Sequence, residues 1–136
     1  MKLKKIISKL SLEEKVSLLS GFDNWHTPDI KKYGIPKIKM SDGPNGVRGD
    51  SSTPQTSACF PSPILLGATW NEKLIKKIGS ATGEEALYKD VDVLLAPTIN
   101  LHRHPLGGRH FECYSEDPVL TCLLYTSDAA DDLLCV

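Results

Sequence analysis

The side chains best suited to chemistry lie in the run Met-Ser-Asp-Gly-Pro-Asn-Gly-Val-Arg, which ends at Arg48. Alternating residues 37–40 before it predict a short strand, and the glycines and proline after Asp42 predict a tight loop. In α/β folds, ligands bind at the carboxyl ends of strands. A carboxylate accepts hydrogen bonds and a guanidinium donates them, so Asp42 and Arg48 suit a ligand rich in hydroxyl groups. On this stretch alone, a surface turn with an incidental ion pair explains the pattern equally well.

A second polar cluster, residues 100–112, holds two arginines, three histidines and a glutamate around a Gly-Gly turn. It follows an apolar run, so we expect Arg109 and Glu112 to face the same rim as Asp42. The histidines raise the question of a metal site. Zinc sites, however, usually show histidines four apart on a helix or paired cysteines, and neither spacing occurs here. No metal and no cofactor are expected.

Several other function classes lack their sequence signals. The Gly-Gly turn has neither the Walker pattern nor the dinucleotide fingerprint, which argues against a nucleotide-binding domain. A nucleophile elbow, Gly-x-Ser-x-Gly, is missing. The net charge of −1 gives no electrostatic basis for binding nucleic acid or a membrane surface. The four cysteines show no metal-ligand spacing and are expected to be reduced. With no signal peptide or membrane span visible, a cytoplasmic location is expected.

The apolar patterns predict alternating helices and strands in a chain of 136 residues. The predicted elements are a helix over 2–10, a helix begun by a capping box at Ser11 and Glu14, a buried strand over 63–69, a helix from Asn71 to about Tyr88, and a strand over 91–97. Buried strands separated by crossover-length segments predict an α/β fold with a parallel sheet, doubly wound or barrel-like.

Trp25 and His26 lie in a polar-aromatic loop. Aromatic faces pack against pyranose rings, so this pair could line a sugar site. The favoured interpretation is a histidine whose hydrogen bonds are satisfied by loop packing.

Together, and in this order, the motifs resemble the N-terminal part of family 3 glycoside hydrolases, the β-glucosidase-like enzymes. The resemblance covers about residue 8 to Thr121 and makes 1–121 an N-terminal fragment of that domain. Its motifs are the segments 10–16, 25–27, 41–48, 60–61, 68–71, 109–112 and 114–118.

The resemblance implies the first strands and helices of a (β/α)8 TIM-type barrel. It also implies that Asp42, Arg48 and Arg109 hold hydroxyls of the terminal, non-reducing sugar of a β-glucoside or oligosaccharide. The implied reaction is retaining hydrolysis of a β-glycosidic bond by two carboxylates. A β-glucosidase is favoured; β-xylosidase, N-acetylhexosaminidase and a non-catalytic carbohydrate-binding module are the alternatives.

The family's nucleophilic aspartate, acid/base glutamate and Lys-His pair lie downstream of this sequence. Glu116 and Asp117 belong to a structural turn in the family motif, so no catalytic residue is expected in this chain. A barrel of this type needs about 250 residues. We therefore expect the isolated polypeptide to be inactive and poorly soluble, with an oligomeric state that the sequence leaves open.

The resemblance stops abruptly after Thr121. Residues 122–131 can be back-translated, codon by codon, into a sequence that resembles a transposase-type sequencing adapter. We predict that residues 122–136 are a non-native tail from adapter read-through; the alternative is a natural but divergent helix.

Overall fold

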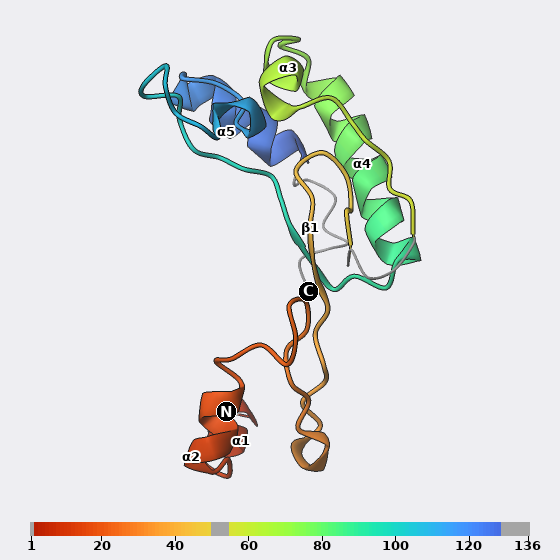
Figure 1. Ribbon diagram of the computed structural model, residues 1–136, viewed down its shortest axis with the longest axis vertical. Coiled ribbons are helices and arrows are strands. Elements are labelled where there is room, and N and C mark those ends of the chain that lie inside the picture. The colour runs from red at the N-terminus through yellow and green to blue at the C-terminus, as the bar shows by residue number, and fades with distance from the viewer. Residues whose placement is uncertain (1, 50–54, 129–136) are drawn as a thin grey trace. The chain divides into compact units, whose positions relative to one another are not determined.

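The computed structural model describes residues 2–49 and 55–128 (Figure 1). The chain divides into two compact units, Met1–Met40 and Ser41–Val136, and each is described by itself. No helix in the described ranges has the length and apolar character needed to cross a membrane.

The first unit holds helices α1 (Lys2–Ile7) and α2 (Leu12–Ser17) and a 3-10 turn, η1 (Lys31–Tyr33). The predicted capping box is confirmed: Ser11 Oγ accepts a hydrogen bond from Glu14 N at 3.2 Å, and Glu14 Oε2 accepts one from Ser11 N at 2.9 Å. These two bonds satisfy amide groups that have no partner within the helix.

The polar-aromatic loop of the first unit pairs with the segment that leads to the first strand. Met40 N donates to Trp25 O at 2.7 Å, and His26 forms an antiparallel bridge with Lys39. The His26 ring Nδ1 lies 2.9 Å from both carboxylate oxygens of Asp23. The prediction of a histidine satisfied by its own loop is confirmed.

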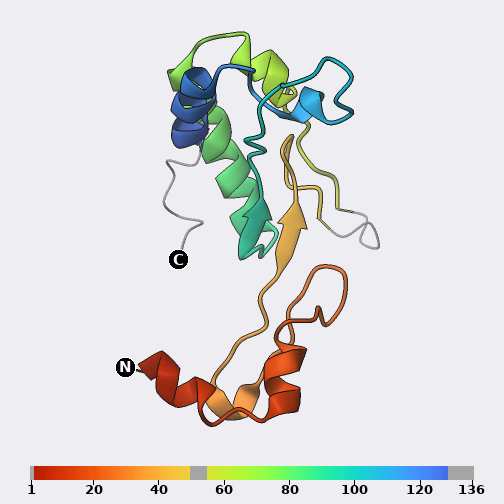
Figure 2. The same cartoon turned by 90° about the vertical axis from the view of Figure 1, so that its left-hand side faces the viewer.

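The second unit contains strands β1 (Met40–Asp42, which begins at the last residue of the first unit) and β2 (Val93–Leu95). They form a two-stranded parallel sheet, and Figure 2 shows both arrows pointing the same way. The remaining elements are α3 (Pro63–Gly67), α4 (Glu72–Tyr88), η2 (His110–Glu112) and α5 (Pro118–Asp128). The α/β class is confirmed in these elements; a closed barrel is not among them.

Helix α4 is confirmed almost residue for residue. Asn71 caps it, accepting a hydrogen bond from Leu74 N through Oδ1 at 3.1 Å. Its buried residues recur every three or four positions, which is the spacing of one helix face: Ile75, Gly79, Gly83 and Ala86.

The buried strand predicted over residues 63–69 is wrong, because this segment contains helix α3. Pro63 stands in the first turn, where its fixed φ suits a helix and its missing N–H needs no partner. The apolar run is also not buried on all sides, since Ile64 is 42% and Leu65 is 58% exposed. Leucine favours helix over strand, and a short apolar run alone does not distinguish the two.

The first strand begins later than predicted. Residues 37–39 lie outside β1, which starts at Met40 and includes Asp42 as its last residue. The backbone of Asp42 is therefore held in the sheet, and this residue is both the end of β1 and the start of the loop.

Candidate functional site

The loop of residues 42–48 is closed by short hydrogen bonds between its two ends. Arg48 N donates to Asp42 O at 3.0 Å, and Gly46 N donates to Gly43 O at 3.3 Å. The side chains meet as well, because Arg48 Nη2 lies 2.5 Å from Asp42 Oδ2. Sequence reasoning placed these two side chains together, and the structure brings them into direct contact. Such charge-assisted bonds fix both direction and distance.

The two glycines inside the loop, Gly43 and Gly46, have no space for a Cβ atom. A Cβ on Gly43 would lie 2.2 Å from Gly46 O, and one on Gly46 would lie 2.1 Å from Ala58 O. Gly46 also has a φ of +139°, which side-chain-bearing residues rarely adopt. The turn residues read from the sequence are therefore required by close packing of the backbone.

Arg109 lies in the second polar cluster and pairs with Glu112. Arg109 Nε and Glu112 Oε1 form an ion pair, but their geometry is not that of a hydrogen bond. The buried Glu112 carboxylate is the main cause that raises the pKa of Arg109, and the charge of Asp42 adds a smaller contribution. The Arg109 head group is largely exposed. The charges of Arg109 and Asp42 thus act on each other without direct contact. The close partner of Arg109 is Glu112, and that of Asp42 is Arg48.

A cavity of about 320 Å³ lies beside Arg109. Its lining is mixed, polar and apolar: Thr98, Asn100, Leu101, Gly107, Gly108, Arg109, His110, Glu112 and Cys113. Amide, guanidinium, imidazole and carboxylate groups can together donate to and accept from several hydroxyls. Neither Asp42 nor Arg48 is among the residues that line this cavity, and the expected common rim stays a prediction.

The histidines of this cluster are engaged with their surroundings. The rings of His102 and His110 stack with centroids 4.8 Å apart, and His102 Nε2 donates to Cys113 O at 3.1 Å. His104 Nδ1 accepts from Leu106 N at 3.2 Å. Among the described residues, no group of three side chains gathers as a metal ion would require. Cys59, Cys113 and Cys122 are free thiols, and Cys135 lies outside the described ranges.

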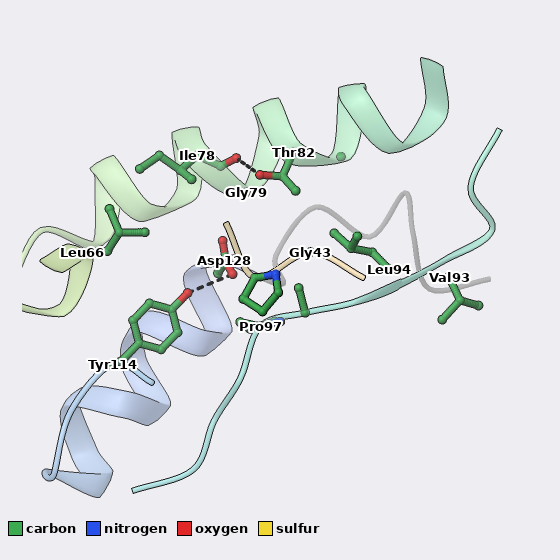
Figure 3. A pocket seen from close by; sticks show the side chains of 13 residues that line it. Gly43, Leu66, Ile78, Gly79, Thr82, Val93, Leu94, Pro97, Tyr114 and Asp128 are labelled. Atoms are coloured by element: carbon green, nitrogen blue, oxygen red, sulfur yellow. Dashed lines mark hydrogen bonds between the residues drawn. The ribbon is translucent and has the colours of Figure 1, made fainter. Parts of the chain in front are cut away.

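A second hollow, of about 160 Å³, lies between α4, β2 and α5 (Figure 3). Leu66, Ile78, Leu94 and Pro97 make its lining mainly apolar. Apolar walls offer few hydrogen-bond partners to a sugar, so this hollow is not assigned to the sugar.

Tyr114 and Asp128 supply the polar contact at that hollow. Tyr114 donates to Asp128 Oδ2 at 2.9 Å (Figure 3). Burial raises the pKa of both groups, most strongly that of the tyrosine. Helix α5 therefore continues into residues 122–128, and the predicted non-native origin of 122–136 stays a prediction.

The turn before α5 has a structural role. Asp117 Oδ1 accepts a hydrogen bond from Val119 N at 2.8 Å, and Asp117 N donates to Ser115 Oγ at 3.0 Å. A carboxylate at this place satisfies an amide of the first helical turn. That Asp117 is no catalytic group stays a prediction.

Two charged residues at the C-terminal end of α4, Glu85 in its last turn and Lys89 just after it, support the 42–48 loop and were not predicted from the sequence. Glu85 and Lys89 contact the backbone of Val47, next to Arg48, and also the Ala58 amide and the Ser57 hydroxyl. Their one sequence signal is an i, i+4 pair of opposite charge, which more often marks an exposed helix face.

Comparison with known proteins agrees with the resemblance. Residues 5–128 match the Glycosyl hydrolase family 3 N terminal domain. A β-glucosidase from Rhizobium radiobacter is 58% identical over 118 residues, covering 85% of this chain and 14% of the relative. The chain thus spans about one seventh of that relative's length.

Solved structures give the same result. The β-glucosidase of Kluyveromyces marxianus, in complex with glucose, aligns with a TM-score of 0.86 and 42% identity, covering 93% of this chain and 15% of that one. Glucose-bound β-glucosidase 3B of Thermotoga neapolitana aligns with a TM-score of 0.81 and 38% identity, covering 98% and 21%.

Proposed function

The chain belongs to glycosyl hydrolase family 3, and from that premise we propose that it is the N-terminal part of a retaining β-glucosidase acting on terminal, non-reducing β-D-glucosyl residues. The observation that carries the proposal is the ion pair of Asp42 with Arg48 on a closed loop at the end of β1. Relatives whose structures are described with glucose support the choice of sugar.

In the proposed site, Asp42 accepts hydrogen bonds from sugar hydroxyls, and Arg48 and Arg109 donate to others. Both arginine head groups are exposed and can reach a ligand. The bonds tighten as the ring distorts toward the oxocarbenium ion, so part of the binding energy lowers the barrier. The nucleophile and the acid/base are assigned to parts of the enzyme outside this chain. The sheet of β1 and β2 is assigned to the start of a (β/α)8 barrel.

The test restores a complete enzyme. Residues 5–121 replace the matching segment of the Rhizobium radiobacter β-glucosidase, and the product is called the chimera. We expect the chimera to hydrolyse an aryl β-glucoside within about tenfold of the kcat/KM of the parent, because the proposed sugar contacts are restored. The 136-residue chain alone is expected to give no turnover.

The substrate range of the chimera separates the alternatives. A folded chimera that prefers an aryl β-xyloside or an aryl N-acetyl-β-glucosaminide would contradict the glucosidase assignment. A folded chimera that binds glucose without turnover, beside an active parent, would favour a non-catalytic sugar-binding role.

We also propose that residues 122–136 are not part of the natural protein. The expected result is that genomic DNA, amplified with a primer inside codons 60–120, diverges from the present sequence after codon 121. Genomic DNA that continues through codon 136 unchanged would contradict this.

A further inference from the structure

We infer that Glu85 of α4 and Lys89, the residue that follows this helix, are positioning residues that hold the backbone beside Arg48 in its sugar-binding form; this inference rests on the proposed function. The pair touches no part of the proposed sugar contacts directly. Its effect passes through Val47, which precedes Arg48 in the chain.

Glu85 ties two separate segments of chain to the helix. Its Oε2 accepts a hydrogen bond from Val47 N at 3.2 Å, and its Oε1 accepts one from Ala58 N at 2.9 Å. The two amides stand 38 and 27 residues away in sequence. One carboxylate therefore fixes the exit of the 42–48 loop and the 57–58 segment that lies against it.

Lys89 donates hydrogen bonds to oxygen acceptors in the same two segments whose amides Glu85 binds. Its Nζ donates to Val47 O at 2.6 Å and to Ser57 Oγ at 2.6 Å, and lies 2.9 Å from Glu85 Oε1. Ser57 Oγ in turn donates to Val47 O at 2.5 Å. Both the N–H and the C=O of Val47 are thus held by the side chains of Glu85 and Lys89, which leaves Arg48 little freedom at its backbone.

The pair is shielded from solvent. The side chain of Lys89 is 4% exposed and that of Glu85 is 15% exposed, and Val47 is fully buried against Ala86 and Val91. Burial alone would raise the pKa of Glu85, but hydrogen bonds from Lys89 and from the Ala58 and Val47 amides outweigh it and lower that pKa. Removing one member takes away the opposite charge that lies 2.9 Å from the other in this shielded place.

A purely structural pair and a positioning pair differ in a double-mutant cycle with Arg48. We expect Glu85→Gln in the chimera to lower kcat/KM for an aryl β-glucoside by about 100-fold, mainly in kcat, as small displacements of a binding group do. In an Arg48→Ala background the same change should cost less than about threefold, because the group that Glu85 positions is already absent.

Glu84→Gln is the matched control. Glu84 is the preceding residue of α4 and is exposed, so the same loss of charge should change kcat/KM less than about twofold. Ser57→Ala is the second variant. It removes the hydroxyl between Lys89 and Val47 O, and it is used if Glu85→Gln fails to fold; the same dependence on Arg48 is expected.

Two results would overturn the inference in distinguishable ways. Equal losses from Glu85→Gln, or from Ser57→Ala, in the Arg48 and Arg48→Ala backgrounds would show that the pair acts independently of Arg48, with the proposed function intact. An Arg48→Ala chimera with unchanged kcat/KM would remove the proposed sugar contact itself, and the inference with it.

Discussion

Replacing Asp42 with alanine in the chimera is expected to lower kcat/KM for an aryl β-glucoside by at least about 100-fold, equivalent to about 3 kcal/mol of transition-state stabilisation. The carboxylate is proposed to accept hydrogen bonds from sugar hydroxyls that strengthen as the ring distorts. The substitution also leaves Arg48 without the partner that lies 2.5 Å away, so the direction of the guanidinium is lost. Steady-state kinetics with a chromogenic glucoside measure both effects.

The control for this prediction is Asp29→Ala. Asp29 is an exposed aspartate of the first unit that pairs with Lys31 at 3.8 Å, a surface contact of small energetic value. Its kcat/KM should stay within about twofold of that of the chimera. An Asp42→Ala chimera that also stays within this range would contradict the assignment of Asp42 to the sugar.

The 42–48 loop was predictable from sequence because its determinants are local. Glycine and proline restrict the backbone where they stand, so the turn after Asp42 can be read without knowledge of the fold. Helix α4 was predictable for the same reason, since Asn71 caps it and its buried face repeats with helical spacing. The apolar run of α3 carried no such periodicity, and its proline fitted a helix start as well as a strand boundary.

The support of the loop was not predictable, because it depends on contacts between distant parts of the chain. Glu85 and Lys89 bind residues 27 to 42 positions away, and no local pattern in the sequence predicts such a contact. Arg109, too, could be predicted only in part from the sequence. Its place near the rim was expected, but its pairing with Glu112 follows from the turn of η2. Convergence of Arg109, Arg48 and Asp42 on one sugar stays a prediction.

Gly46 lies where the 42–48 loop packs against the 57–58 segment. Gly46→Ala is expected to have the second large effect on kcat/KM. An added Cβ would lie 2.1 Å from Ala58 O, so either the loop or the 57–58 segment must move away. The φ of +139° adds backbone strain to the clash. Because Glu85 holds both segments, the displacement reaches Val47 and then Arg48. We expect kcat/KM of the chimera to fall by about 100-fold or more.

Gly34→Ala is the control that separates the steric clash expected in Gly46→Ala from the backbone strain of placing alanine at a positive φ. Gly34 has a φ of +68° and open space within 4 Å of its Cβ position, so alanine there meets only the backbone strain, of about 1–2 kcal/mol. Kinetics and thermal unfolding of both variants should show a modest loss of stability with Gly34→Ala and near-normal kcat/KM. Equal kcat/KM for the two variants would mean that the close approach of Gly46 to Ala58 does not determine the shape of the loop.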